Sequence, residues 1–245
     1  MEVIHLKETN STNSYIHQLL TEKKEPEEGT LVWTGFQTAG RGQNQNKWES
    51  ERDANLTFSL LLSPNFIPAT EQFLLSQVAA LGVVDFLSSF CGLTDLSIKW
   101  SNDIYWRDKK ICGMLIENLL SGYSISHTIL GIGINVNQTV FKDGAPNPVS
   151  VKQINGKSYD LNLAIIAVRE AILSRYMQLL RDEKEQIRKD YFNCLYRGKG
   201  YFNYKDQSGK FSARIKDIRD NGLLVLETTN GEERVYAFKE VSFVL

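Results

Sequence analysis

The sequence predicts an α+β fold in which a mixed, largely antiparallel sheet with flanking helices is followed by a small C-terminal β-barrel. Apolar runs between residues 31 and 62 and between 96 and 136 have the length and composition of strands. A wide apolar stripe over 71–90 and a second helical pattern from 160 indicate helices that pack on this sheet. From 198 onward, short alternating segments separated by turns indicate the barrel.

The first helix is predicted directly after the polar segment Ser11-Thr12-Asn13. Apolar residues recur at helical spacing from Ser14 to Glu22, and the preceding polar residues are suitable N-caps. Two apolar runs, 31–36 and 55–62, then indicate strands. A polar loop between them is therefore expected to be held at both ends by the sheet.

The middle of the chain is predicted to supply a buried helix and most of the sheet. Residues 71–90 carry apolar side chains interrupted by small residues, a pattern typical of a helix packed on a sheet. Four strand signals follow at 96–100, 103–106, 111–120 and 125–136, with 107–110 as the turn between the second and the third. This region is expected to be largely antiparallel.

A loop-rich stretch and a long helix come next. Residues 138–159 are rich in Pro, Gly, Asn and Lys, and a helical pattern that opens at Asp160 runs towards Tyr196. We expect the helix to break near Asp182, where charged residues become dense.

The remaining segments alternate in polarity and are short. Three turn signals separate them: Ser208-Gly209, Asn221-Gly222 and Asn230-Gly231. About five strands are predicted, enough for a small barrel that docks on its neighbour. The predicted domains are therefore residues 1–196 and residues 197–245.

Composition narrows the classes of function. The chain has 245 residues, 42% of them hydrophobic, and a formal net charge of −1, so it lacks the bulk charge that attracts nucleic acid or an anionic membrane. Its three cysteines, Cys91, Cys112 and Cys194, are far apart and suggest neither a disulfide framework nor a zinc site, which favours a reducing cytoplasm. The N-terminus lacks an apolar signal core, and no run approaches the roughly 18 apolar residues of a membrane span. A soluble protein is expected.

Residues 37–48 have the composition of a ligand-binding loop. Gly40 and Gly42 allow close approach of the backbone to a ligand, and Arg41 offers a permanently charged fork that suits a carboxylate or a phosphate. An anionic ligand is the expectation. The alternative is a solvated hairpin loop with one arginine, because Gly-x-Gly alone is weak evidence.

Three further segments make the pattern specific. They are Lys99-Trp-Ser-Asn-Asp, Lys110-Ile-Cys-Gly-Met-Leu-Ile-Glu and Gly131-Ile-Gly-Ile-Asn. With Ser11-Thr12-Asn13 upstream and Gly40-Arg41-Gly42 and Trp48 in the loop, the chain resembles the biotin protein ligases over nearly its whole length. The resemblance implies a class-II-synthetase-like catalytic domain, an SH3-like C-terminal domain, and ATP-dependent activation of biotin followed by its transfer to a carrier lysine.

The resemblance also implies the catalytic residues. Arg41 and Lys110 would offset the repulsion between the biotin carboxylate and the ATP phosphates, and Asp103 would hold and deprotonate the carrier lysine. The alternatives are a surface charge pair for the two cations and turn formation for Asp103. Lys109 is interpreted as a solvated turn residue.

The binding residues fall into two groups. Biotin would be held by Ser11, Thr12, Asn13, Gln37, Gly40, Arg41, Lys110, Gly113 and Gly131, because its neutral ureido ring needs hydroxyl, amide and backbone partners. The nucleotide would contact Arg41, Trp48, Asn102 and Asn135. Ordinary roles compete with these: helix capping for Ser11 or Thr12, bulges for the glycines, core packing for Trp48 and strand-end hydrogen bonding for Asn135. No metal ligands are expected, and His5, His17 and His127 lack ligand spacing.

One residue and one four-residue segment depart from the family pattern. Ser101 stands where proline is usual, and Gln43-Asn44-Gln45-Asn46 replaces a segment with arginines and a glycine. We expect residues 40–47 to be mobile without ligand and to order over the adenylate, which they would retain less firmly than arginine-rich relatives do.

The expected partners are biotin, ATP with Mg²⁺, and a biotin carboxyl carrier protein. No helix-turn-helix precedes Ser11, so sequence-specific DNA binding is not expected. An exposed strand could pair two subunits as a homodimer. The alternatives are a lipoate or octanoate transferase of the same fold, a non-catalytic ligand sensor, and a nucleic-acid binder acting through the small barrel.

Overall fold

The structure, a computed structural model, describes residues 2–22, 24, 26–42, 48–141 and 147–244. Its main sheet has seven strands in the order β1-β2-β3-β7-β6-β5-β4. The strands are β1 (Val3–Leu6), β2 (Leu31–Thr34), β3 (Leu56–Leu62), β4 (Leu96–Lys99), β5 (Asp103–Trp106), β6 (Lys109–Ser121) and β7 (Ser124–Ile134). β1 runs parallel to β2 and the other neighbours are antiparallel, which confirms the mixed, largely antiparallel sheet.

Two details of this sheet differ from the prediction. β1 was not predicted, because four residues of alternating exposure give little local signal. The turn before β6 is shorter than expected, since the strand already begins at Lys109. At the β4 edge, Ile98 exchanges hydrogen bonds with Cys194 and Tyr196, so that edge is covered in part, whereas β1 forms the other edge.

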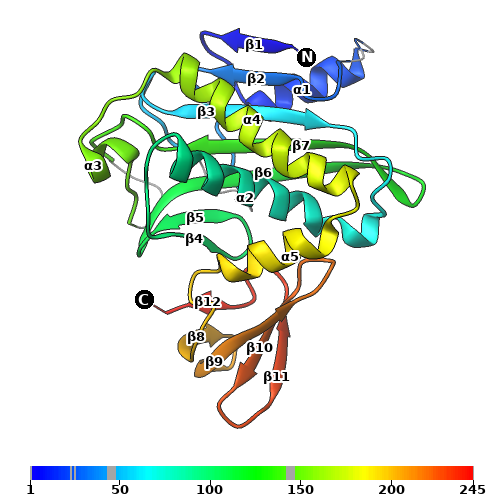
Figure 1. Ribbon diagram of the computed structural model, residues 1–245, viewed down its shortest axis with the longest axis vertical. Coiled ribbons are helices and arrows are strands. Elements are labelled where there is room, and N and C mark those ends of the chain that lie inside the picture. Colours follow the sequence, from blue (N-terminus) through cyan, green and yellow to red (C-terminus); the bar gives the residue numbers. More distant parts are fainter. Residues whose placement is uncertain (1, 23, 25, 43–47, 142–146, 245) are drawn as a thin grey trace.

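Helices cover both faces of the sheet (Figure 1). They are α1 (Thr12–Thr21), the 3₁₀ turn η2 (Ala69–Glu71), α2 (Phe73–Ser89), α3 (Val151–Asn155), α4 (Leu161–Leu180) and α5 (Lys184–Asn193). On one face α2 and α4 pack over a large core that includes Phe58 and Leu60. On the other face Ile16 of α1 packs with Val32, Leu61 and Ile129. Since successive residues of a strand point to opposite faces, α1 and the α2–α4 layer lie on opposite sides of the sheet.

The helix ends follow the predicted signals. Asp160 caps α4 by accepting a hydrogen bond from the Asn162 backbone N–H. The break between α4 and α5 falls at Asp182, which has a positive φ of 59°. The short helix α3 was not predicted. A capping box of Ser150 and Gln153 begins it.

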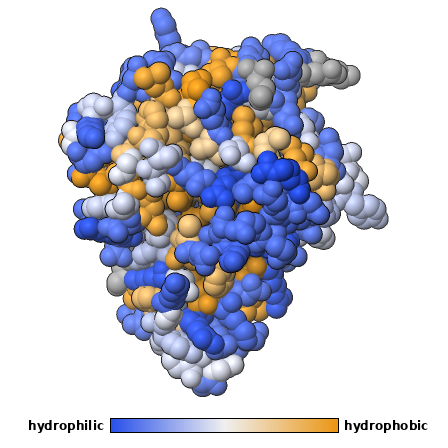
Figure 2. Space-filling view, in the orientation of Figure 1, coloured by the Kyte–Doolittle hydropathy of each residue, from blue (hydrophilic) through white to orange (hydrophobic). Residues whose placement is uncertain are grey.

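The helix layer combines buried and exposed apolar surface. The segment Ala69–Ser89 is long and apolar enough to cross a membrane, but 67% of its most apolar part is buried inside the protein, as in a core helix. On the outer side of the layer, α4 leaves Leu163, Ile166, Met177 and Leu180 exposed. Figure 2 shows this face, where hydrophobic and hydrophilic surface alternate.

A second, five-stranded antiparallel sheet follows α5. Its strands are β8 (Phe202–Asp206), β9 (Gly209–Ile218), β10 (Leu224–Thr228), β11 (Glu233–Tyr236) and β12 (Ser242–Phe243), in the order β11-β10-β9-β8-β12. All five predicted strands are confirmed. The SH3-like closure and the domain boundary between residues 196 and 197 stay predictions.

A stability prediction arises where Arg175 joins three helices. From α4 its guanidinium contacts Asp85 of α2 at 2.6 Å and Asp190 of α5 at 2.7 Å, and these hydrogen bonds raise its pKa. Arg175→Leu should lower the free energy of unfolding by about 2 kcal/mol, because two carboxylates lose their partner in a partly buried site. Urea unfolding measures this change. Arg181→Leu is the control, since among the described residues Arg181 forms an ion pair with the neighbouring Glu183 alone, at the surface. An equal loss in both variants would contradict the prediction.

Candidate active site

The predicted site residues gather on the α1 face of the main sheet. Residues 113, 115 and 117 of β6 alternate towards one face, and in the ladder Gly113 lies opposite Gly133 and Leu115 opposite Gly131 of β7. This is the face on which α1 packs, because Ile129, two residues before Gly131, belongs to the α1 cluster. The strip along β6 and β7 is therefore the floor of the candidate site.

One end of this strip carries a network of neutral polar groups. Gln37 Oε1 accepts hydrogen bonds from the Thr12 backbone N–H at 2.8 Å and from Thr12 Oγ1 at 3.2 Å. Ser59 Oγ bonds Thr12 Oγ1 at 2.7 Å and Asn13 Oδ1 at 2.5 Å. Ser11 is the N-cap residue of α1, but its side chain makes no capping hydrogen bond. The structure thus brings Ser11, Thr12, Asn13 and Gln37 together, all but Gln37 buried.

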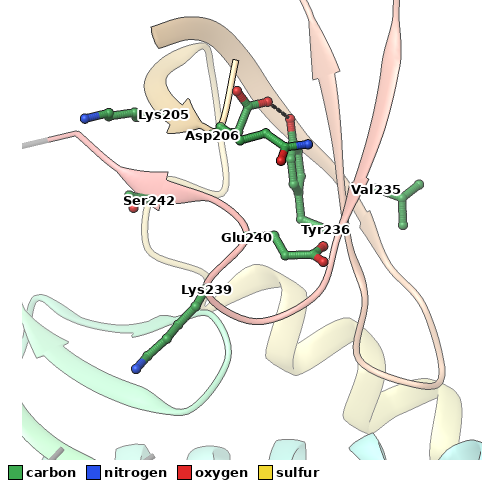
Figure 3. Close-up of a pocket in the computed structure, with 8 residues that line it drawn as sticks. Lys205, Asp206, Val235, Tyr236, Lys239, Glu240 and Ser242 are labelled. Atoms are coloured by element: carbon green, nitrogen blue, oxygen red, sulfur yellow. Dashed lines mark hydrogen bonds between the residues drawn. The ribbon is translucent and has the colours of Figure 1, made fainter. Parts of the chain in front are cut away.

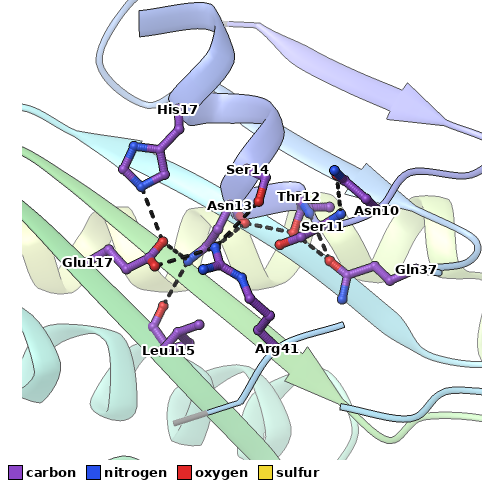
Figure 4. A network of polar contacts seen from close by, with 11 residues as sticks. Asn10, Ser11, Thr12, Asn13, Ser14, His17, Gln37, Arg41, Leu115 and Glu117 are labelled. Carbon is purple, nitrogen blue, oxygen red and sulfur yellow. Dashed lines mark hydrogen bonds and ion pairs between the residues drawn. The ribbon is translucent and has the colours of Figure 1, made fainter. Parts of the chain in front are cut away.

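Glu117 connects this network to Arg41 (Figure 4). Its carboxylate accepts from Asn13 Nδ2 at 2.7 Å, lies 3.3 Å from His17 Nε2 and pairs with Arg41 Nη2 at 3.4 Å. The Arg41 side chain is 48% exposed. An exposed pair of this kind is worth roughly 0.2–1 kcal/mol, so an incoming anion can exchange with Glu117 at small cost.

The absence of a side chain at Gly131 leaves room for the Asn13 side chain against the sheet. A Cβ atom at Gly131 would overlap the Asn13 side chain, so Gly131 contacts a protein amide in this structure. Gly40 has a related role in the loop: its carbonyl accepts from the Trp48 backbone N–H at 3.1 Å, and a Cβ there would meet the Trp48 carbonyl at 2.5 Å. Residues 43–47 lie outside the described residues, and with them most of the loop for which we predicted ordering by ligand.

The other end of the strip carries Lys110. Its Nζ lies 2.8 Å from Asp103 Oδ1, and the Lys110 side chain is 19% exposed. The Lys110 backbone is fixed by hydrogen bonds with Asn147 and Val149. Arg41 and Lys110 are not a mutual charge pair, because each has its own carboxylate partner. Lys109 is exposed, as expected, although it is on β6 and not in the turn.

Trp48 lies over the glycines between these two ends. Its indole would overlap a Cβ at Gly133, and its Cζ3 would lie 3.3 Å from one at Gly113. The Nε1–H is buried and has no hydrogen-bond partner among the described residues. A buried donor without a partner is costly, so a ligand acceptor at this position would relieve it.

The two asparagines assigned to the nucleotide differ in their surroundings. Asn102, in the β4–β5 corner, is buried and donates to the Met114 carbonyl at 2.7 Å. Asn135 is also buried, but it donates to the Val149 carbonyl and its backbone binds Val151, which is the structural role weighed against nucleotide contact. Ser101 precedes Asn102 and follows a cis peptide bond.

Asp103 has two lysines near it, Lys99 and Lys110. Burial lowers the pKa of Lys99, and Asp103 opposes that shift. The Lys110 ammonium also lies near Asp103, at 2.8 Å. In the described ranges no group of three or more His, Cys, Asp or Glu residues is placed to hold a metal ion.

Three residues of the site were missed in the sequence, Ser59, Gly133 and Glu117, and a fourth, His17, was named there only as lacking ligand spacing. Glu117 and Gly133 lie inside the quoted motifs, and His17 follows Asn13 by one helical turn. These positions in the sequence could have identified the three residues as members of the site. Ser59 sits in an apolar strand and gave none.

A cleft in the C-terminal sheet is distinct from this site (Figure 3). It is lined by Lys205, Asp206, Gln207, Val235, Tyr236, Lys239, Glu240 and Ser242. None of these residues was predicted to take part in the chemistry, and the polar strip on the α1 face remains the candidate site.

Comparison with known proteins places the chain in a family. Residues 5–135 match the model of the Biotin/lipoate A/B protein ligase family. Bifunctional ligase/repressor BirA of Bacillus spizizenii is 30% identical over 233 residues, which cover 93% of this chain and 70% of the relative. Biotin--[acetyl-CoA-carboxylase] ligase of Paracoccus denitrificans is 35% identical over 129 residues, 51% of this chain and 53% of the relative.

Solved structures agree with the sequence relatives. The biotin protein ligase of Aquifex aeolicus in complex with biotin and ATP superposes with a TM-score of 0.78 and 26% identity, over 98% of this chain and 97% of that protein. This likeness confirms the α+β class of the fold. The match of the family model and the similarity to these ligases show that the chain belongs to the Biotin/lipoate A/B protein ligase family.

Proposed function

We propose that the protein is a biotin protein ligase, which uses ATP to form biotinyl-5′-AMP and pyrophosphate and then transfers the biotinyl group to a lysine of a biotin carboxyl carrier protein. The observation that carries this proposal is the polar strip itself. Neutral hydroxyl and amide groups occupy one end, and cations lie near both ends. A ligand with a neutral ureido head and a carboxylate tail matches that order of groups.

The first step joins two anions. A biotin carboxylate oxygen attacks the α-phosphorus of ATP, and the bond to the leaving pyrophosphate breaks. Lys110 and Arg41 reduce the repulsion between the reactants, and Lys110 stabilises the negative charge that develops on the phosphate oxygens. Mg²⁺ would enter as part of the nucleotide substrate, bound to the phosphates. The Trp48 indole would cover the adenine.

The second step needs a neutral amine. The carrier lysine attacks the acyl carbon of biotinyl-AMP, the bond to AMP breaks, and one proton leaves the amine. Asp103 is the assigned base, since it is a partly exposed carboxylate beside Lys110, 2.8 Å away. One residue pair thus serves both steps, with the cation used in adenylation and the carboxylate in transfer.

ATP–pyrophosphate exchange with different acids tests the proposal. Exchange should require biotin and should be negligible with lipoate, octanoate or no acid, because Thr12, Gln37 and Ser59 offer polar partners that an alkyl chain cannot use. Exchange with lipoate or octanoate in place of biotin would assign the chain to the other branch of its family. Exchange with none of them would favour a non-catalytic binder.

Gly131 provides a prediction for biotin binding. Gly131→Ala should weaken biotin at least tenfold, because the new Cβ displaces Asn13 and the polar network around it. Isothermal titration measures the affinity. Ile129→Val, on the same strand and face, is the control: it should cost about 1 kcal/mol of stability and leave biotin affinity unchanged. If both variants bind biotin as the parent does, the ureido ring does not lie at Asn13.

A further inference from the structure

Three consecutive residues lead into Asn102 and Asp103, and each contacts the C-terminal third of the chain. Lys99 Nζ lies 5.5 Å from the ring centroid of Phe243, although its hydrogen bond, at 3.0 Å, goes to Tyr105 Oη of β5. The Ser101 carbonyl accepts from Tyr191 Oη of α5 at 2.7 Å. The residue between them, Trp100, extends into the C-terminal sheet.

Trp100 is anchored in the C-terminal sheet. Its indole is 6% exposed, and Nε1 donates to the carbonyl of Gly222, in the turn between β9 and β10, at 3.0 Å. The ring also meets Phe238 edge-on, with 6.0 Å between centroids. A buried N–H with one well-made hydrogen bond and aromatic packing fixes the orientation of the indole.

The turn that receives this hydrogen bond also contacts helices α5 and α2. Asp220 pairs with Arg188 of α5 at 2.8 Å, and the Gly222 N–H donates to the Arg219 carbonyl at 2.7 Å. Gly222 has a φ of +87°, and a Cβ there would lie 2.7 Å from Cδ2 of Phe73 on α2, so only glycine fits. Figure 1 shows the β9–β10 turn reaching up beside α5. The β9–β10 turn thus contacts α5, α2 and Trp100, and it connects the C-terminal sheet to the main domain.

The geometry points to a positioning role for this turn. Lys99 lies opposite Asp103 in the β4–β5 ladder, with Trp100, Ser101 and Asn102 forming the corner between them. We propose that the β9–β10 turn, acting through Trp100, positions Asp103 for the transfer step. This inference rests on the proposed function. The adenylation step depends less on the corner, because β6 holds the two residues assigned to it: Lys110 by backbone hydrogen bonds, and Asn102 by its hydrogen bond to the Met114 carbonyl at 2.7 Å.

Trp100→Phe tests the inference, since it keeps an aromatic ring and removes only the N–H. The rate of biotinyl transfer from isolated biotinyl-AMP to the carrier should fall about tenfold, because a small displacement of a reacting group is costly. The KM for biotin and the ATP–pyrophosphate exchange rate should stay within about twofold of the parent values. This split between half-reactions is a readout that a loss of stability alone would not produce.

Two further variants make the test decisive. Ile215→Val removes a methyl group from the buried core of the C-terminal sheet and should leave transfer unchanged at an equal folded fraction. Asp220→Ala removes the side chain that pairs with Arg188 at the surface, so it should fold and slow transfer in the same direction as Trp100→Phe. Parental transfer in Trp100→Phe, or in Asp220→Ala if the former fails to fold, overturns the inference, as does equal slowing in Ile215→Val. A failure of the proposed function would instead appear as absent exchange in the parent.

Discussion

Lys110→Ala is expected to lower the rate of biotin-dependent ATP–pyrophosphate exchange about a hundredfold or more, by analogy with loss of one preorganised donor to a developing oxyanion. The side chain is mostly buried, and its ammonium lies 3.1 Å from the position that a Cβ at Gly113 would take, so it projects over Gly113 beside the Trp48 ring. There the carboxylate and the α-phosphate would meet. Water cannot replace a cation held in that position without reorganising.

Lys109→Ala is the matched control for this variant. The two lysines are adjacent on β6, but Lys109 is exposed whereas Lys110 contacts Asp103. Exchange by Lys109→Ala should stay within about twofold of the parent rate. Near-normal exchange in a folded Lys110→Ala protein would refute the assignment, and equal losses in both variants would mean that general charge near the site is what matters.

Arg41→Ala is expected to slow exchange in the same direction. Arg41 reaches its position from the loop and contacts Glu117 and Ser14 in the structure. Its participation therefore requires an exchange of partners, from the Glu117 carboxylate to the ligand anion. Lys110 also contacts a carboxylate, but it lies on β6, where the sheet sets its position, and for this reason the larger effect is expected there.

The fold could be predicted where the signal is local. The strands β2 to β7 are marked by apolar runs, α4 by its Asp160 cap, and the C-terminal strands by their turns. β1 could not be predicted, because it pairs in parallel with β2 through a connection that holds α1, and its four residues carry no pattern of their own.

The candidate site could be predicted as a set of residues but not as a set of contacts. The motifs named Arg41, Lys110 and Asp103, yet nothing in them showed that Arg41 would pair with Glu117 and Lys110 with Asp103. Gly131 was assigned to a ligand, while in the structure its missing side chain accommodates Asn13. Glycine spacing reveals that a neighbour approaches closely; only the three-dimensional arrangement shows which neighbour it is.

Asp103→Asn should separate the two half-reactions. Transfer from isolated biotinyl-AMP to the carrier is expected to slow by about 10²–10⁴-fold, the range found for removal of a general base, because an amide cannot accept the proton of the carrier lysine. Exchange should fall far less, since Asn retains an oxygen that can accept a hydrogen bond from Lys110. Single-turnover mixing of the enzyme–adenylate complex with carrier measures transfer, and ATP–pyrophosphate exchange measures the first step.

The choice of nucleophile sharpens this test. Hydroxylamine is largely unprotonated at neutral pH and needs no base, so Asp103→Asn should react with it at nearly the parent rate while remaining slow with the carrier lysine. Asp108→Asn is the matched control: Asp108 lies in the adjacent turn, where it accepts a hydrogen bond from Tyr196 Oη at 2.6 Å. Its loss should leave transfer unchanged. If Asp103→Asn slowed both nucleophiles equally, Asp103 would act by holding Lys110 and the β4–β5 corner in place, and the proton would have to leave by another route.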